Sequence, residues 1–139
     1  MIENYNQTTI QNIYYLDENN NIKFFMDEDL EESIKGPRVI IYDGEYILDV
    51  VPIVYEEILV GRKSIDATPE IDLSEIDESR YTSRRHAMIY KYEGDYYIKK
   101  LSQKNSLHVN AEAVVENEVK LNDNDMIILS RKFPLKFRL

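Results

Sequence analysis

The sequence of 139 residues contains no cysteine, which excludes disulfides, thiol nucleophiles and cysteine metal sites. No apolar run in it approaches the roughly 20 residues that a membrane-spanning helix needs. The N-terminus is polar and acidic, without the basic and apolar regions of a signal peptide. With 43% hydrophobic and 31% charged residues, the chain has the composition of a globular domain rather than a disordered segment. We therefore expect a cytoplasmic protein with one main domain.

Basic residues are scarce in the first part of this acidic chain, whose formal net charge is −9. Residues 1–60 carry three Lys or Arg against thirteen Asp or Glu, whereas residues 61–110 carry nine against eight. Duplex nucleic acids are bound through many basic side chains on phosphates, so we expect no nucleic-acid partner. A single phosphate needs far fewer cations. Five cations do lie close together in the sequence: Arg84, Arg85, Lys99, Lys100 and Lys104.

Most of the sequence predicts short β-strands separated by turn residues. The predicted strands cover residues 38–42, 45–51, 56–62, 86–92, 95–101, 107–110, 113–115, 126–130 and 135–139. Asp43-Gly44 and Glu93-Gly94 have the composition of two-residue hairpin turns, in which both central residues adopt positive φ. Turn signals that recur about every ten residues are typical of a β-sandwich or a β-barrel.

We expect residues 1–36 to form an acidic N-terminal extension, and residues 37–139 to form the β-sandwich. In the extension, NIYYLDENNNIKFF predicts two short strands around an Asn-rich turn, and DEDLEESIKGP predicts a short capped helix. The segment DENNNIKFFMDE also has acidic and amide residues at calcium-loop positions. Ile22 stands where such a loop needs glycine, which favours the hairpin turn and no metal site.

Four motifs follow one another in a recognisable order: GR at 61–62, SRRH at 83–86, NSLHVN at 105–110 and LNDND at 121–125. This order and spacing resemble the forkhead-associated (FHA) domain of bacterial type, over about residues 37–139. The resemblance implies an all-β sandwich of about eleven strands, which binds phosphothreonine peptides through the loops at one end. It implies a binding module that is not an enzyme and has no cofactor.

The resemblance also suggests which residues bind the phosphopeptide. Arg62, Ser83 and Arg84 match the phosphate-contacting positions of the family, and Asn105 matches the residue that holds the peptide backbone. Lys104 stands where the family often has Thr or Ser. The chemistry is suitable, because an arginine fork and a hydroxyl group can bind the strong acceptor oxygens of a phosphate. Taken singly, each residue also fits an ordinary surface or turn position.

Other motif residues match structural positions of the family. Gly61 ends a predicted strand, His86 is expected to brace the loops from inside, and Asn110 is expected to fix a loop. The sequence departs from the family pattern at two turns, where Ser106 and Asn124 stand in place of glycine. Serine tolerates positive φ less well than glycine, whereas asparagine adopts it more easily than most residues.

Two functions remain open at this point. The first is a signalling module that docks a protein phosphorylated by a Ser/Thr kinase, either the kinase itself or its substrate. The second is an assembly domain that docks a protein partner independently of phosphate. Arg62 with Ser83 and Arg84 favours the first, which we predict; the Asn105-Ser106 turn and the acidic extension favour the second. The sequence has no phosphate-binding P-loop and no common hydrolase motif.

Overall fold

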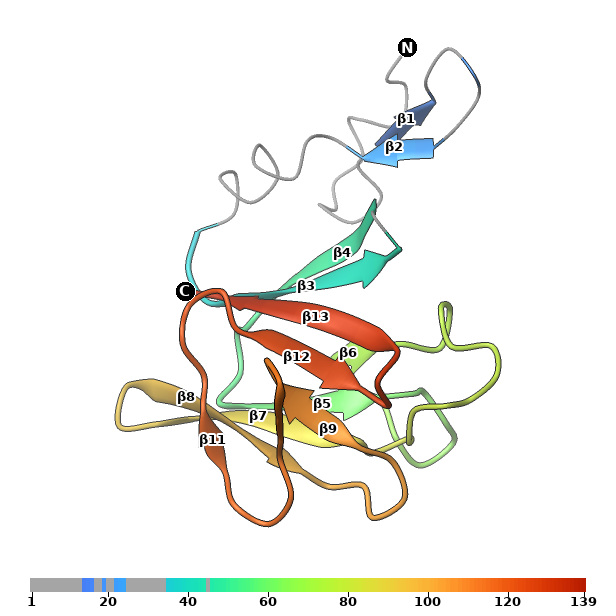
Figure 1. Cartoon of the computed structure of the whole chain (residues 1–139). Coiled ribbons are helices and arrows are strands. Elements are labelled where there is room, and N and C mark those ends of the chain that lie inside the picture. The colour runs from blue at the N-terminus through green and yellow to red at the C-terminus, as the bar shows by residue number, and fades with distance from the viewer. Residues whose placement is uncertain (1–13, 17–18, 20–21, 25–34, 45) are drawn as a thin grey trace.

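The protein is described here by a computed structural model, which covers residues 14–16, 19, 22–24, 35–44 and 46–139. Within these residues the chain has thirteen strands and no helix. A six-stranded and a five-stranded sheet pack face to face (Figure 1). The predicted all-β sandwich of about eleven strands is therefore confirmed. The helix predicted shortly before Gly36 lies almost entirely outside the described residues.

The six-stranded sheet has the strand order β10-β9-β12-β13-β3-β4. Its strands are β10 (Glu112–Ala113), β9 (Leu107–Val109), β12 (Met126–Leu129), β13 (Phe133–Arg138), β3 (Arg38–Asp43) and β4 (Tyr46–Pro52). The five-stranded sheet has the order β11-β8-β7-β5-β6. Its strands are β11 (Val119–Lys120), β8 (Asp95–Lys100), β7 (Ala87–Tyr92), β5 (Glu57–Gly61) and β6 (Ile71–Asp72).

Two further strands, β1 (Tyr14–Leu16) and β2 (Ile22–Phe24), form the antiparallel hairpin that was predicted in the N-terminal extension. The other predicted strands are present, with ends that differ by one or a few residues. The sequence did not predict β6 and β11, which have two residues each. Strands so short have no periodicity of their own, and their neighbours β5 and β8 define them.

The core lies between the two sheets and follows from the period of two along each strand. On β13, Leu135 and Phe137 are fully buried, whereas Lys136 between them points to the other face. Ile89 and Ile98 face them from β7 and β8, and both are fully buried. Burial of each such side chain contributes about 1.5–3 kcal/mol. The packed sandwich gives the loops at its ends a rigid base.

The Glu93-Gly94 turn has the expected backbone, whereas at the other predicted turn only Gly44 does, because Asp43 belongs to β3, pairs with Tyr46 and does not adopt positive φ. Glu93 and Gly94 adopt φ values of 49° and 86°, and Gly44 adopts a φ of 63°. Positive φ at these positions matches the right-handed twist of the paired strands. In the described part of the chain, no helix has the length and apolar character needed to cross a membrane.

Candidate phosphate-binding site

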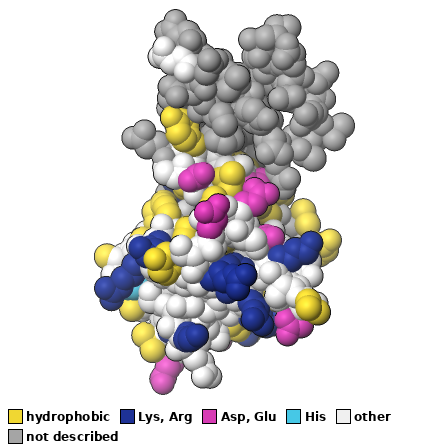
Figure 2. Space-filling view, turned by 90° about the vertical axis from the view of Figure 1, so that its right-hand side faces the viewer, with side chains coloured by type: hydrophobic (Ala, Val, Ile, Leu, Met, Phe, Trp, Pro, Cys, Tyr) yellow, Lys and Arg dark blue, Asp and Glu magenta, His cyan; other side chains and the backbone are white. Residues whose placement is uncertain are grey.

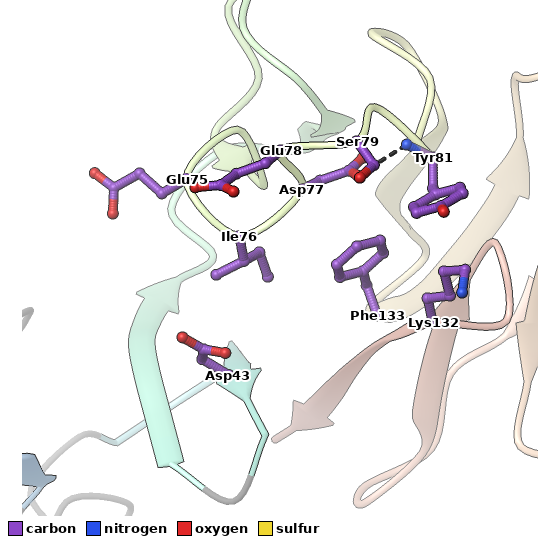
Figure 3. A pocket seen from close by; sticks show the side chains of 9 residues that line it. All are labelled: Asp43, Glu75, Ile76, Asp77, Glu78, Ser79, Tyr81, Lys132 and Phe133. Carbon is purple, nitrogen blue, oxygen red and sulfur yellow. Dashed lines mark hydrogen bonds between the residues drawn. The ribbon is translucent and has the colours of Figure 1, made fainter.

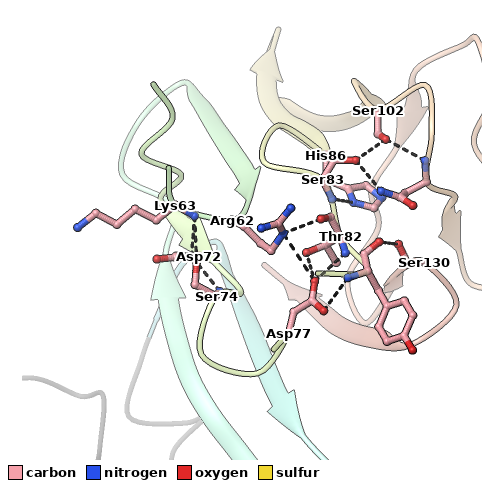
Figure 4. Close-up of polar contacts among 12 residues, drawn as sticks. Arg62, Lys63, Asp72, Ser74, Asp77, Thr82, Ser83, His86, Ser102 and Ser130 are labelled. Atoms are coloured by element: carbon pink, nitrogen blue, oxygen red, sulfur yellow. Dashed lines mark hydrogen bonds and ion pairs between the residues drawn. The ribbon is translucent and has the colours of Figure 1, made fainter. Parts of the chain in front are cut away.

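Three loops meet where β5, β6 and β8 end, and hydrogen bonds join them (Figure 4). They are the β5–β6 loop (62–70), the β6–β7 loop (73–86) and the β8–β9 loop (101–106). The backbone N–H of Arg62 donates to the carbonyl oxygen of Arg84 over 3.2 Å. The β12–β13 turn joins them, because Ser130 Oγ donates to the carbonyl oxygen of Tyr81 over 2.6 Å. The predicted site motifs at 61–62, 83–86 and 105–106 therefore lie at one place.

Gly61 allows the close approach of β5 to the β6–β7 loop. A Cβ atom at this position would overlap the carbonyl oxygen of Arg84 and would lie 2.8 Å from that of Ser83. These neighbours are backbone atoms, which cannot move aside as a flexible side chain would. Glycine is therefore required here by space, and the approach places Arg62 beside Ser83 and Arg84.

The side chain of Arg62 is held at its base and free at its tip. Its Nε donates to the carbonyl oxygen of Thr82 over 2.6 Å and lies 3.9 Å from Oδ2 of Asp77. Only 18% of the side chain is exposed. Within the described residues, its two terminal nitrogens have no hydrogen-bond partner. An arginine with this arrangement presents a rigid pair of donors to an incoming anion.

Asp77 supports Arg62 from within the fold. Its carboxylate is buried and accepts hydrogen bonds from Tyr81 N, Thr82 N and Thr82 Oγ1 over 2.5–2.8 Å. Burial by itself would raise the pKa of Asp77, but these hydrogen bonds and the charge of Arg62 outweigh it, and the pKa is lowered. Asp77 is therefore a carboxylate at neutral pH. Asp77 and Thr82 carry no signal of this role in the sequence, because their spacing alone resembles an ordinary turn.

Ser83 and Asn105 contact each other directly, and each of them also contacts Ser102. Ser102 Oγ accepts hydrogen bonds from the backbone N–H groups of Lys104 and Asn105, over 3.2 and 2.9 Å. Its own proton is then directed to Ser83 Oγ, which lies 2.6 Å away. Ser83 Oγ also accepts from Asn105 Nδ2 over 2.8 Å. With both lone pairs in use, Ser83 has its O–H left to donate to a ligand.

His86 joins the β6–β7 loop to the β8–β9 loop and is fully buried. Its Nδ1 accepts from Ser83 N over 3.1 Å, and its Nε2 lies 2.8 Å from the carbonyl oxygen of Ser106. The imidazole must therefore carry its proton on Nε2 and donate it to Ser106. Burial, followed by the nearby Lys100, lowers the pKa of His86, although the bond to Ser106 acts in the other direction. His86 is a neutral link inside the fold and lies behind Ser83 and Asn105.

The cations that lie close together in the sequence do not all lie at the loop end of the sandwich. Arg84, Arg85 and Lys104 are exposed, and within the described part of the chain their side chains have no hydrogen-bond or ion-pair partner. A hydrogen bond from Ser64 is the main cause that lowers the pKa of Asp66, and Arg84 and Arg85 add to it. Lys99 lies 5.5 Å from the centre of the Tyr90 ring, on the outer face of the five-stranded sheet. Lys99 therefore does not belong with the loop cations.

Asn110 lies apart from Ser83 and Asn105. Its Oδ1 accepts from Met126 N over 3.0 Å, and its Nδ2 donates to Asp125 over 3.1 Å. These bonds join the β9–β10 turn to the β11–β12 turn. Asn124 adopts a φ of 73° in place of the family's glycine, whereas Ser106 keeps a negative φ. The Asn105-Ser106 turn therefore forms without a strained serine.

Comparison with known proteins identifies the family. The family model of the FHA domain matches residues 58–130, which is more than half of the chain. The chain therefore belongs to the FHA family, as the order of its motifs predicted. No curated protein matches it in sequence.

Solved structures of FHA domains have the same fold. The FHA domain of an Arabidopsis thaliana protein is 25% identical, with a TM-score of 0.61 over 74% of this chain and 84% of that one. Mycobacterium tuberculosis EmbR, solved with a low-affinity phosphopeptide, is 25% identical, with a TM-score of 0.57 over 73% of this chain and 24% of EmbR. The MEK1 FHA domain, solved with a HOP1 phosphothreonine peptide, is 19% identical, with a TM-score of 0.58 over 76% and 98% of the two chains.

Proposed function

We propose that the loop end of the sandwich binds phosphothreonine segments of a protein partner, and that the protein acts by docking rather than by catalysis. The observation that carries this proposal is the state of Arg62, whose Nε is fixed by Thr82 and Asp77 while its terminal nitrogens are free. The fork of Arg62 and the free O–H of Ser83 offer donors to phosphate oxygens. Arg84 and Lys104 add positive charge nearby.

The partner is a protein phosphorylated by a Ser/Thr kinase, either the kinase itself or its substrate. EmbR and the MEK1 FHA domain, which share the fold, were solved with phosphopeptides. The absence of cysteine suits a reducing, cytoplasmic setting for the binding of such a partner. Two or three charge-assisted hydrogen bonds, reduced by the cost of association, correspond to dissociation constants on the order of micromolar.

The test is a screen of an oriented phosphothreonine library against the full chain, with the unphosphorylated library as control. We expect binding that requires the phosphate. The phosphoserine version of a selected peptide lacks one methyl group, whose burial is worth about 0.8 kcal/mol, so it should bind roughly fourfold more weakly. Equal binding of phosphorylated and unphosphorylated peptides would instead support the assembly domain that works without phosphate.

Arg62→Ala tests the site itself. Loss of its charge-assisted hydrogen bonds, worth about 1.5–3 kcal/mol each, should weaken phosphopeptide binding by at least roughly tenfold. The melting temperature should also fall, because the Thr82 carbonyl oxygen loses the Arg62 Nε donor and the buried Asp77 carboxylate loses its cation, so binding is measured at a temperature where wild type and variant are both folded. Arg85→Ala removes the same charge from a neighbouring exposed position and should weaken binding by less than about threefold. Equal losses in the two variants would refute a specific role for Arg62.

A further inference from the structure

A second hollow lies beside the phosphate-binding residues. It has a volume of about 600 Å³ and opens between the β6–β7 loop, the β12–β13 turn and the end of β3 (Figure 3). Ile76, Tyr81 and Phe133 supply its apolar side, and Phe133 and Tyr81 stand next to each other in the view. Asp77 also lines the hollow, so one residue is common to it and to the support of Arg62.

The rim of this hollow carries unbalanced negative charge. Asp43, Glu75 and Glu78 are exposed, and none of them forms an ion pair with any residue that the structure describes. The one cation in the lining, Lys132, has its Nζ 4.6 Å from the centre of the Tyr81 ring. On the side of the molecule drawn in Figure 2, several Asp and Glu side chains lie close together above most of the Lys and Arg side chains, and a few others lie lower.

The chemistry of the lining limits what can bind there. Within the described residues, no group of three or more Asp, Glu or His side chains is placed to hold a metal ion. Glu75 and Glu78 lie on the β6–β7 loop and Asp43 lies at the end of β3, with the apolar side chain of Ile76 between them (Figure 3). A long basic side chain fits this combination, because its aliphatic stem can pack on Ile76 and Phe133 while its charged end reaches the carboxylates.

The two sites are close enough for one extended segment. Thr82, whose carbonyl oxygen holds Arg62, follows directly on Tyr81 in the wall of the hollow. Ser83, which follows Thr82, is the proposed phosphate ligand. An extended peptide advances about 3.3 Å per residue, so a few residues separate a phosphate at Ser83 from a side chain in the hollow. A basic residue at a constant offset from the phosphothreonine would therefore reach it.

We propose that this hollow, the acidic pocket, binds an arginine or lysine side chain of the same segment whose phosphothreonine contacts Arg62. The acidic pocket is defined by Asp43, Ile76, Glu75, Glu78, Tyr81 and Phe133. The inference rests on the proposed function and narrows its ligand class to phosphothreonine segments with a basic residue at one offset. An acidic residue at that offset is repelled by the rim.

The test places a single arginine at each position in turn on either side of the phosphothreonine, in an otherwise uncharged peptide. Fluorescence anisotropy with the full chain then gives a dissociation constant for each position. We expect arginine at one offset to strengthen binding roughly three- to tenfold over the uncharged peptide, since each exposed charge pair contributes modestly. Citrulline, which has nearly the shape of arginine without its charge, should lose most of that gain.

Variants of the rim show where the preference arises. The triple variant Asp43→Asn, Glu75→Gln and Glu78→Gln should bind the uncharged phosphopeptide as the wild type does, but without the arginine preference. The matched control removes three exposed carboxylates elsewhere: Glu93→Gln, Glu112→Gln and Glu116→Gln. It has the same change in net charge and should keep the preference.

The possible results separate the two proposals. If phosphopeptides bind but arginine brings no gain at any offset, the acidic pocket has no such role, and the proposed function still stands. If the preference persists in the rim variant, the basic side chain binds elsewhere and the inference is wrong. If no phosphopeptide binds at all, both proposals are overturned.

Discussion

Replacement of His86 by alanine should destabilise the fold more than it removes any direct ligand contact. The imidazole makes two buried hydrogen bonds, one from Ser83 N over 3.1 Å and one to the Ser106 carbonyl oxygen over 2.8 Å. In His86→Ala, a backbone donor and a backbone acceptor lose their partners at once. Each buried group left without a partner costs about 1–3 kcal/mol, and water that enters the space offsets part of that cost.

We therefore expect His86→Ala to lower the free energy of unfolding by about 2–4 kcal/mol at pH 7.5. For a domain of roughly 100 residues this corresponds to a fall of about 10–20 °C in melting temperature. Urea unfolding followed by tyrosine fluorescence measures the change. His108→Ala is the matched control, because Nδ1 of His108 has no partner among the described residues, and it should cost under about 1 kcal/mol.

The pH dependence gives an independent check of the same contacts. Burial lowers the pKa of His86 in the folded protein below its ordinary value of 6.5. The unfolded chain therefore binds a proton first as pH falls through 6.5, and the wild type loses stability there. Because His86→Ala lacks this group, its deficit should be smaller at pH 5.5 than at pH 7.5. An equally stable His86→Ala variant that no longer binds phosphopeptide would refute the bracing role and point to a ligand contact.

Three further substitutions test other parts of the structure. Burial, and then the charge of Glu75, raises the pKa of Asp49 to about 6. Asp49→Asn should therefore stabilise the fold by about 2 kcal/mol at pH 7.5 but by little at pH 4, since the folded carboxyl loses its proton only near pH 6. Urea unfolding at both pH values measures this effect, and an equal effect at both would contradict the prediction. Gly61→Ala forces a Cβ against the backbone of Arg84 and should cost about 1–3 kcal/mol in the same assay, with weaker phosphopeptide binding; a neutral effect would show that the loop yields easily. Asp77→Asn removes the charge 3.9 Å from Arg62 Nε and should lower both the stability of the fold and the affinity for the phosphopeptide. Calorimetric titration measures the affinity, and an unchanged value would mean that Arg62 needs no support from Asp77.

Some features of this protein were predictable because they depend on neighbouring residues only. Glu93-Gly94 adopts the turn backbone that its composition predicts, since glycine adopts the positive φ of a two-residue hairpin turn without steric cost. The alternation around Leu135 and Phe137 placed a strand with one face in the core. The order of the motifs predicted the family, and the structure brings Arg62, Ser83 and Asn105 to one end of the sandwich.

Other features depend on which loops meet, and short stretches of sequence carry no signal for that. Ser102 became part of the site because its hydroxyl lies between Ser83 and the N–H groups of the β8–β9 loop. Lys99 looked like part of a basic cluster, but strand alternation places it over Tyr90 on an outer sheet face.

The acidic pocket is the clearest case in which the tertiary structure decided the outcome. Asp43 and Phe133 lie on the neighbouring strands β3 and β13 of one sheet, and Glu78 of the β6–β7 loop meets them only because the two sheets pack together. The sequence by itself determined the strands, the tight turns and the order of the binding motifs, because these depend on backbone preferences and periodicity within a few residues. The tertiary structure decided which buried groups hold Arg62 and which charges face one another, because those contacts join segments that only the packed core brings together.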